Sequence, residues 1–352
     1  IIARLKHGYR SMHRPEPPAT ALPGVSSDVP LPARAILHHN RMTLVNGESM
    51  PSTHAQQPIR TLVTGATGFT GRYLVDNLLG RGHTVIETVA GRHEPETPTR
   101  VRLDITSPDM CRRVIETVRP DYIVHLAAIS FVGHNDPLDF YRVNVLGTLN
   151  LLEACAAVGH TPRKLLIASS ANVYGNVTSD AIDETFPVTP VNHYAASKAA
   201  METMVRTWFD RLPILIVRPF NYTGRGQASN FLVPKIVEHF ARREPAIELG
   251  NIDVARDFSD VRYVASAYEA LLDSAAAAET VNVCTGTPYT LREILSAASD
   301  LTGHEIEIQV NPAFVRQTDV KMLAGSPAKL RSLVPKVEAI PFMDTLRWML
   351  AA

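Results

Sequence analysis

Residues 61–71 read TLVTGATGFTG, in which a short apolar strand runs into three glycines, Gly65, Gly68 and Gly71, spaced three residues apart. A strand, a glycine turn and a helix that begins near Phe69 are typical of a site for the pyrophosphate of a nucleotide. Glycine lets the backbone approach the phosphates, and the start of a helix offers unpaired N–H groups and a positive dipole end. The alternative is a purely structural turn, because this spacing differs from the commoner G-x-G-x-x-G.

From about residue 60 onward, short apolar runs alternate with amphipathic stretches. Buried parallel strands are predicted at residues 61–63, 85–89, 122–126, 164–168 and 214–217, and helices at 72–79, 110–118, 140–157 and 195–209. This alternation predicts an α/β fold of the Rossmann type, with a doubly wound parallel sheet and a smaller C-terminal α/β lobe. Ligands of such a sheet bind at the carboxyl ends of its strands, so the chemistry is expected directly after each strand.

Residues 1–57 differ from the rest of the chain. They contain many prolines and no apolar periodicity, so we predict a disordered N-terminal extension, in which Met42 or Met50 could be the true start. We expect the Rossmann domain at residues 58–222 and the second lobe at 223–352. The stretch at about 260–286 is expected to return to the main sheet, because it ends in the strand-like run VNVCTG.

Composition excludes several classes of function. Lys and Arg total 35 and so do Asp and Glu, and a formal net charge of zero argues against a nucleic-acid partner. No apolar run is long enough to cross a bilayer, so no membrane partner is expected. The cysteines Cys111, Cys155 and Cys284 lie far apart, which suggests neither a disulfide framework nor a metal site. We therefore expect a cytoplasmic protein.

The residues after the second and third strands concern the choice of cofactor. An NAD site usually has an acid after the second strand, whereas the 2′-phosphate of NADP needs positive charge. Arg92, together with Arg72 directly after the third glycine, favours NADP, although either could be a solvated charge and NAD remains possible. Glu87 could be the acid only if its strand ended early. Asp104 could bind the adenine amine, or it could be a plain loop residue.

Tyr194 and Lys198 lie four residues apart and share one helix face. An ammonium beside a phenol favours the phenolate, so we expect Lys198 to lower the pKa of Tyr194 from about 10 and make it a usable acid/base. Ser170, which follows the fifth strand, could bind a substrate oxygen while its protonation changes. A lone Y-x-x-x-K motif is unspecific, but the combination with this serine and the glycine turn is specific.

Together these motifs resemble the extended short-chain dehydrogenase/reductase family that acts on nucleotide sugars. The resemblance covers the chain from about residue 60 to its end and rests on the glycine turn, HLAA at 125–128, SSANVYG at 169–175, YAASK at 194–198 and RPFN at 218–221. It implies that Tyr194 is the acid/base, that Lys198 positions the nicotinamide ribose and that Ser170 binds the reacting oxygen. The predicted cofactor contacts are Gly65, Thr67, Gly68, Phe69, Thr70, Gly71, Arg72, Arg92, Asp104, Ile105, Leu126, Ala127, Ala128, Tyr194 and Lys198.

The residues after Ser170 narrow the reaction. Sugar 4,6-dehydratases of this family carry proton-transferring side chains there, but this chain has Ala171 and Asn172, which cannot carry a proton. Elimination of water is therefore disfavoured. Two hydride-transfer reactions remain: reduction of a 4-keto sugar, or 4-epimerisation with a tightly bound NAD. A non-catalytic dinucleotide-binding scaffold is a further alternative, against which the intact Ser170, Tyr194 and Lys198 speak.

The second lobe resembles the GDP-mannose branch of this family, through RPFNYTGRGQ at 218–227 and GNIDVARDF at 250–258. The resemblance implies that Asn221 and Arg256 contact the nucleotide diphosphate and its ribose, and that Arg316 reaches the same group. The alternative for Arg256 is a surface ion pair with the next residue, Asp257.

The resemblance to that branch also implies a substrate and an assembly. The predicted substrate contacts are Ser130, Ser170, Asn172, Asn221, Arg256 and Arg316. The implied activity is the NAD(P)H-dependent reduction of the 4-keto group of a GDP-6-deoxy-4-keto-hexose, as in the synthesis of GDP-rhamnose. A homodimer or a dimer of dimers is implied through the helices at 140–157 and 195–209, although their apolar faces could equally belong to the core.

Overall fold

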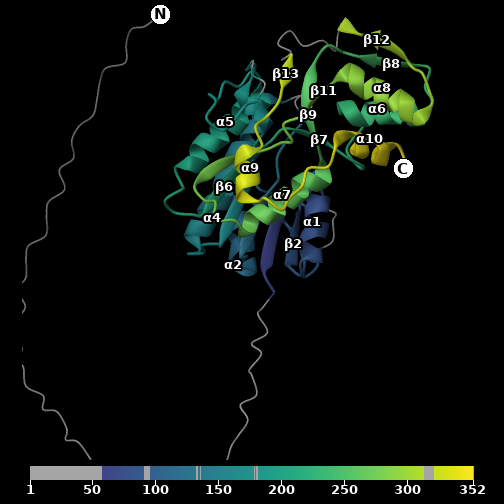
Figure 1. The fold of residues 1–352 in the computed structure, drawn as a ribbon. Helices are drawn as coiled ribbons and strands as arrows, with labels where there is room; N and C mark the ends of the chain where they lie inside the picture. The colour runs from purple at the N-terminus through teal and green to yellow at the C-terminus, as the bar shows by residue number, and fades with distance from the viewer. Residues whose placement is uncertain are drawn as a thin grey trace, which may run out of the picture. The chain divides into compact units, whose positions relative to one another are not determined.

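The computed structural model describes residues 58–90, 96–131, 134, 136–177, 179, 181–312 and 321–351 (Figure 1). These residues belong to one compact unit, Gln56–Ala352. The predicted N-terminal extension at residues 1–57 lies outside the described residues. The division of the remaining chain at about residue 222 stays a prediction.

The core of this unit is a seven-stranded sheet in which every neighbouring pair of strands is parallel. Its strands, in sheet order, are β10 (Glu279–Val283), β6 (Ile214–Pro219), β5 (Lys164–Ala168), β4 (Tyr122–His125), β1 (Arg60–Thr64), β2 (Thr84–Val89) and β3 (Arg100–Arg102). The chain runs outward from β1 through β2 to β3 and then returns to form β4 on the other side of β1. The prediction of a Rossmann-type doubly wound sheet is confirmed, and the reversal beside β1 marks where such folds bind ligands.

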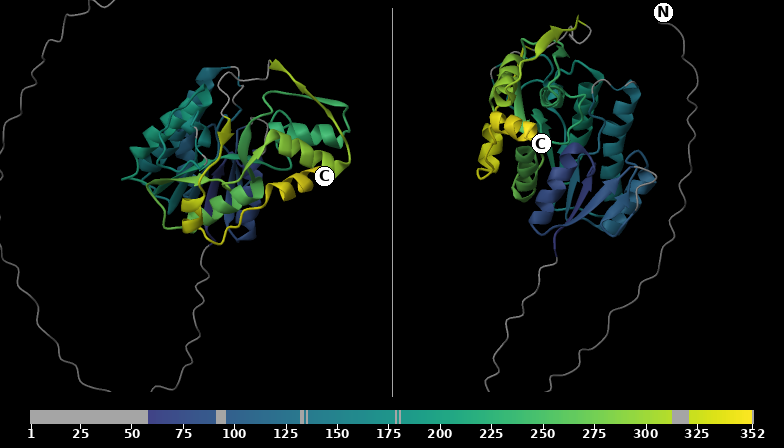
Figure 2. Two further views of the ribbon diagram at one scale, coloured as in Figure 1. Left: turned by 45° about the horizontal axis from the view of Figure 1, so that its top comes forward. Right: turned by 90° about the vertical axis from the view of Figure 1, so that its right-hand side faces the viewer.

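Helices cover both faces of this sheet (Figures 1 and 2). One face is covered by α1 (Phe69–Gly80), α7 (Val261–Asp273) and α9 (Ala328–Leu333), and the other by α2 (Pro108–Val118), α4 (Thr148–Ala157) and α5 (His193–Arg206). Successive strand residues point to opposite faces, so Leu62 packs in the second of these cores and Val63 in the first. Burial on both faces explains why the strands are continuous apolar runs.

The second lobe has its own apolar core, built on three helices, with small sheets beside it (Figure 1). The helices are α6 (Leu232–Ala241), α8 (Leu291–Thr302) and α10 (Phe342–Leu350). The strands are β7 (Asn221–Thr223), β8 (Ala246–Leu249), β9 (Ala255–Asp260), β11 (Pro288–Thr290), β12 (Glu307–Val310) and β13 (Met322–Leu323). α8 begins with a capping box, in which the Thr290 side chain accepts from the Glu293 N–H and the Glu293 side chain accepts from the Thr290 N–H.

The structure differs from the sequence prediction at residues 140–157, which do not form one regular helix. They are divided among α3 (Pro137–Tyr141), the π-helix η1 (Arg142–Gly147) and α4. The side chain of Asn144 accepts a hydrogen bond from the Ile129 N–H at 3.0 Å and donates to the Ile129 carbonyl at 3.2 Å. The wider π turn therefore brings this amide to the loop after β4, a common use of such turns at functional sites.

Among the described residues, no helix is both long and apolar enough to span a membrane. The same part of the chain contains no group of three His, Cys, Asp or Glu side chains that could hold a metal ion.

Candidate active site

The glycine turn joins β1 to α1 and leaves the start of that helix open. Gly65 has a φ of +70°, and a Cβ at this position would lie 2.8 Å from the Ala127 nitrogen. A Cβ at Gly71 would lie 2.3 Å from the Gly65 carbonyl oxygen. Gly68 is the N-cap of α1 and provides no side-chain cap, and the first turn contains no acid. The first backbone N–H groups of α1 are therefore available to a phosphate. The tight packing around Gly65 and Gly71 explains why the turn requires glycine.

A cleft of about 1360 Å³ lies over the carboxyl ends of the sheet strands and continues into the second lobe. The predicted site residues that line it are Gly65, Thr67, Gly68, Phe69, Thr70, Gly71, Asp104, Ile105, Leu126, Ala127, Ala128, Ser130, Ser170, Asn172, Tyr194, Lys198, Asn221 and Arg256. Of the other predicted contacts, Arg72 does not line this cleft, and Arg92 and Arg316 lie outside the described residues. The structure therefore brings residues from both halves of the chain to one cavity.

Two charged residues near the cofactor end of the cleft have partners elsewhere. Arg72 donates a hydrogen bond to the Gly226 carbonyl at 3.0 Å, so it joins α1 to the loop after β7. Glu87 pairs with Arg100 on β3 at 3.1 Å and does not line the cleft. At the end of β2, the described residues that line the cleft are Thr88 and Ala90, neither of which is acidic.

Ser170, Tyr194 and Lys198 meet where β5 ends beside the first turns of α5. Asn192 caps this helix, with its side chain accepting from the Ala195 N–H at 2.9 Å. Ser170 lies close enough to the Tyr194 phenol to lower its pKa, and Lys198 Nζ donates to the Ala168 carbonyl at 2.7 Å. All three members of this group are buried.

Burial sets the acidity of Tyr194 and Lys198. Loss of solvent raises the pKa of Tyr194 to about 12, although the neighbouring Ser170 acts in the opposite direction. Burial also lowers the pKa of Lys198 to about 8, partly offset by the negative charge of Glu202. The expectation that Lys198 lowers the pKa of Tyr194 is therefore wrong. The ammonium bonds a backbone carbonyl, and desolvation of the phenolate dominates.

On the second-lobe side, Arg256 and Asp257 have different surroundings. Arg256 lines the cleft, and its guanidinium donates to the Ala255 carbonyl at 2.8 Å. Asp257 is buried and accepts hydrogen bonds from the Thr285 hydroxyl at 2.7 Å and the Gly286 N–H at 2.8 Å. Burial raises the pKa of this carboxyl. The alternative of a surface ion pair is therefore wrong, because Asp257 ties β9 to the loop after β10.

Sequence reasoning missed Tyr222, which connects the two sides of the cleft. Its hydroxyl lies 2.8 Å from Thr70 Oγ1, and its ring stacks on Phe69 with a centroid distance of 6.0 Å. Its position directly after Asn221 was the only signal available. Other polar second-lobe residues also line the cleft: Gln227 and Asn251 lie within the quoted stretches 218–227 and 250–258, and Asn230, Lys235 and Glu248 belong to no motif.

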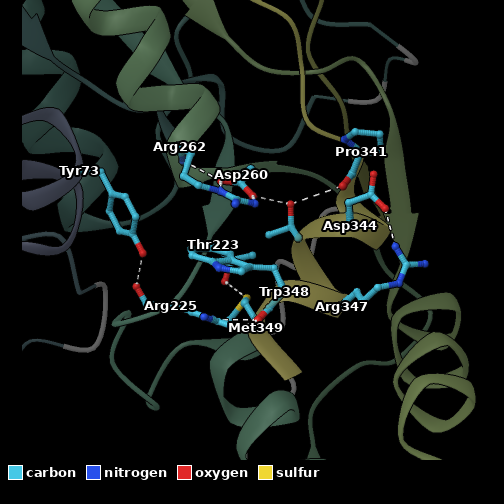
Figure 3. Close-up of polar contacts among 11 residues, drawn as sticks. Tyr73, Thr223, Arg225, Asp260, Arg262, Pro341, Asp344, Arg347, Trp348 and Met349 are labelled. Carbon is cyan, nitrogen blue, oxygen red and sulfur yellow. Dashed lines mark hydrogen bonds and ion pairs between the residues drawn. The ribbon is translucent and has the colours of Figure 1, made fainter. Parts of the chain in front are cut away.

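The loop that carries Gln227 is held between α1 and the C-terminal helix (Figure 3). Tyr73 on α1 donates to the Arg225 carbonyl at 2.7 Å, and Arg225 Nε donates to the Trp348 carbonyl at 2.8 Å. The guanidinium of Arg262 lies 3.8 Å from the centroid of the Trp348 ring. α10 therefore supports one wall of the cleft.

This chain is similar to known nucleotide-sugar enzymes over most of its length. A family model described as GDP-mannose 4,6 dehydratase matches residues 62–335. A GDP-6-deoxy-D-talose 4-dehydrogenase from Aggregatibacter actinomycetemcomitans is 38% identical over 276 residues, which cover 78% of this chain and 91% of the relative. A GDP-6-deoxy-D-mannose reductase from Pseudomonas aeruginosa is 34% identical over 306 residues, which cover 83% of this chain and 96% of the relative.

Solved structures support the same relationship. RMD from Pseudomonas aeruginosa, complexed with NADPH, is 32% identical with a TM-score of 0.72, covering 83% of this chain and 98% of that one. The complex of the Thermus thermophilus UDP-glucose 4-epimerase with NAD has the same identity, TM-score and coverage. The resemblance predicted from the motifs is confirmed, and the chain belongs to the GDP-mannose 4,6-dehydratase family.

Proposed function

We propose that this protein is an NADPH-dependent oxidoreductase that reduces the 4-keto group of a GDP-linked 6-deoxy-4-keto-hexose. The observation that carries the proposal is the meeting of Ser170, Tyr194 and Lys198 in the cleft that also contains the glycine turn and Arg256. A candidate proton donor, a turn suited to a phosphate and an arginine suited to a second diphosphate thus line one cleft. The names of the two curated relatives support chemistry at C4 of a GDP-6-deoxyhexose.

The roles of the three residues follow from their acidity and hydrogen bonds. With a pKa of about 12, Tyr194 holds its proton at neutral pH and can donate it to the sugar O4. Ser170 lies beside Tyr194 and its hydroxyl can steady the same oxygen as it gains the proton. Lys198 is mostly charged below its pKa of about 8, and the family resemblance implies that its ammonium positions the nicotinamide ribose. The bound nicotinamide supplies the hydride.

The segment after Ser170 supports reduction over dehydration. Ala171 is buried in an apolar cluster, and Asn172 lines the cleft with an amide that cannot carry a proton. Among the described residues that line the cleft, the carboxylates are Asp104 after β3 and Glu248 in β8. Neither belongs to the segment that follows Ser170, which is where the resemblance implies that a dehydratase would carry its acid and its base.

The choice of NADPH rests on the end of β2. Thr88 and Ala90 line the cleft there, while Glu87 is paired with Arg100, so none of these described residues places an acid against a ribose 2′-position. The solved complex of RMD with NADPH supports the same choice. Arg92, which the sequence predicts as a 2′-phosphate ligand, stays a prediction.

The direct test supplies NADPH and a GDP-4-keto-6-deoxyhexose to the purified protein. We expect loss of the reduced-nicotinamide absorbance and formation of one 6-deoxyhexose, with its C4 configuration read by NMR. 6-Deoxymannose and 6-deoxytalose differ only at C4, so this spectrum decides which face of the carbonyl receives hydride. Failure to consume either NADPH or NADH with any GDP-linked keto sugar would overturn the proposal.

A 4-epimerase with tightly bound NAD is the second candidate, favoured by the similarity to the Thermus enzyme. An epimerase would copurify with NAD and interconvert two nucleotide sugars without net redox change. Mass spectrometry of the nucleotide released on denaturation separates the two functions, since we expect NADP(H) or an empty site for the reductase.

We also propose that the protein is a homodimer through α3, η1 and the exposed side of α5. Leu138 and Leu146 are 58% and 52% exposed on α3 and η1, unusually high for leucine. Light scattering after size exclusion should give twice the chain mass or a multiple of it. Leu146→Asp should shift that mass to the monomer, and a monomeric wild-type protein would contradict the assignment.

A further inference from the structure

An ion pair is buried directly behind the candidate active site. Arg218 on β6 donates to Glu202 on α5 through two bonds, from Nε at 2.8 Å and from Nη2 at 2.5 Å. Both side chains are almost inaccessible, with residue exposures of 1% for Arg218 and 2% for Glu202. Removing two charges from water is costly, and such pairs are weak contributors to stability compared with apolar side chains of the same volume. A role other than stability is therefore worth testing.

The pair holds together elements that carry the active-site groups. Ser169 at the end of β5 donates to Glu202 at 2.6 Å. Arg218 also donates to the Tyr174 hydroxyl at 2.9 Å, and that hydroxyl donates to Asn282 on β10 at 2.7 Å. The network thus joins α5 to the ends of β5, β6 and β10 and to the short helix η2 (Ala171–Tyr174).

Glu202 lies next to the active-site group in both sequence and space. Ser169 is the residue before Ser170, so the hydrogen bond to Glu202 holds the backbone from which Ser170 projects. Lys198 lies one helical turn before Glu202 on α5, and the two share a face of this helix. Movement of Glu202 would therefore change the spacing between Ser170 and Lys198.

Several charged or titratable groups surround Lys198. From its own helix come Tyr194 and Glu202, from β4 comes His125, and from β6 comes Arg218 behind Glu202. His125 is neutral at working pH, because burial and the Lys198 charge lower its pKa to about 3. Glu202 raises the pKa of Lys198, and burial lowers it.

The partners of Glu202 and His125 complete this environment. Arg206 on α5 also contacts Glu202, at 3.3 Å, from a side chain that is 47% exposed. His125 is held between two threonine hydroxyls, those of Thr64 at 2.7 Å and Thr148 at 2.9 Å. Among the groups named as facing Lys198, Glu202 is thus the one that supplies a negative charge.

We propose that Glu202 is a positioning residue for the reaction: Arg218 and Ser169 hold it, and it fixes α5 against β5 and presents its carboxylate one helical turn from Lys198. This inference rests on the proposed function for its kinetic consequences, but its structural part can be measured without turnover. It predicts that removing either partner of the ion pair changes the ionisation of Lys198, and in opposite directions.

The kinetic test compares Glu202→Gln with Arg218→Gln across pH. The first variant leaves Arg218 as an uncompensated positive charge, so the alkaline loss of kcat should move to lower pH by about one unit. The second leaves the Glu202 carboxylate without its main partner, so the same limb should move to higher pH. Loss of activity in both variants with an unchanged pH midpoint, or shifts in the same direction, would reduce the pair to a structural role and overturn the proposal.

One further variant separates the position of the Glu202 carboxylate from its charge, and a second serves as a control. Glu202→Asp keeps the charge but shortens the side chain, so kcat should fall while the pH midpoint stays near that of the wild-type protein. Glu269→Gln is the matched control, because Glu269 is also a buried glutamate paired with an arginine, Arg81 at 2.8 Å, but lies on α7 outside the cleft. Its pH profile should equal that of the wild-type protein.

An NMR titration tests the charge relationship without a substrate. The Lys198 side-chain signal, observed in protein with ¹³C-labelled lysine and assigned through Lys198→Arg, should titrate at lower pH in Glu202→Gln and at higher pH in Arg218→Gln.

If either variant fails to fold, the double variant Glu202→Gln/Arg218→Gln restores charge balance and should titrate between them. If no keto sugar is reduced but the NMR midpoints move as stated, the proposed function fails and the role of Glu202 stands. Unmoved midpoints overturn that role whatever the activity.

Discussion

The ammonium of Lys198 donates a hydrogen bond to the carbonyl oxygen of Ala168 at 2.7 Å. This bond ties α5 to the last residue of β5, next to the segment that carries Ser170. It also gives a hydrogen-bond acceptor to an ammonium whose side chain is buried. This contact fixes the position of Lys198, whereas burial sets its pKa.

We predict that activity and the Lys198 contribution to stability change in opposite directions at alkaline pH. Because burial lowers the pKa of Lys198 to about 8, the ammonium and hence kcat should be lost as the pH rises through about 8. Between that value and about 10.4 the unfolded chain binds more protons than the folded one, so folding gains stability as pH rises. Denaturation of wild-type protein and Lys198→Met, compared at pH 7 and 9, should show the wild type gaining relative to the variant.

Tyr194→Phe removes the proposed proton donor and keeps the ring. We expect kcat to fall by about 10² to 10⁴-fold, the usual contribution of a positioned acid, with little change in NADPH affinity. Stopped-flow measurement of NADPH oxidation gives the first quantity and fluorescence titration the second. Activity within a few-fold of the wild type would mean that another group delivers the proton.

Gly71→Ala tests the cofactor turn. The new Cβ would lie 2.3 Å from the Gly65 carbonyl oxygen, so α1 must move away from the turn. We expect at least about tenfold weaker NADPH binding, equivalent to about 1.4 kcal/mol. Gly80→Ala is the matched control, because it ends the same helix and its Cβ would meet nothing within 4 Å. Equal NADPH affinity in both variants would contradict this account.

Trp348→Ala tests the support of the cleft wall by α10 (Figure 3). Trp348 lies against the guanidinium groups of Arg225 and Arg262, at 5.0 Å and 3.8 Å from the ring centroid. Because its side chain is only partly buried, we expect a loss of about 2 kcal/mol, less than for a core tryptophan. Arg347→Ala on the same helix breaks only an exposed ion pair with Asp344, so chemical denaturation should show a change below about 1 kcal/mol.

Much of the candidate site could be predicted because its signals are local. The apolar runs of the strands, the glycine turn and the Tyr194–Lys198 spacing depend on residues close together in the chain. A parallel sheet then brings the carboxyl ends of its strands to one edge, so residues that follow different strands meet without further information. This is why Asp104, Ala127 and Ser170 line the same cleft, as predicted.

The errors concern properties that depend on distant segments. The lysine one turn along the helix predicts a more acidic Tyr194, but the pKa of this tyrosine is set by the protein packed around it. Asp257 adjoins Arg256 in sequence, yet its partners come from the loop after β10. The π turn in η1 depends on the bonds between Asn144 and Ile129, which belong to different elements.

The amino-acid sequence alone was sufficient for the fold class and for the glycine turn and side chains that line the candidate site, because backbone sterics and residue spacing act over a few residues. How those side chains are charged and held depends on the folded protein. The burial of Lys198, the pairing of Glu202 with Arg218 and the contact of Tyr222 with Thr70 each join residues that meet only when the sheet has formed. Desolvation and long-range hydrogen bonds are properties of that assembled interior, so no local pattern contains them.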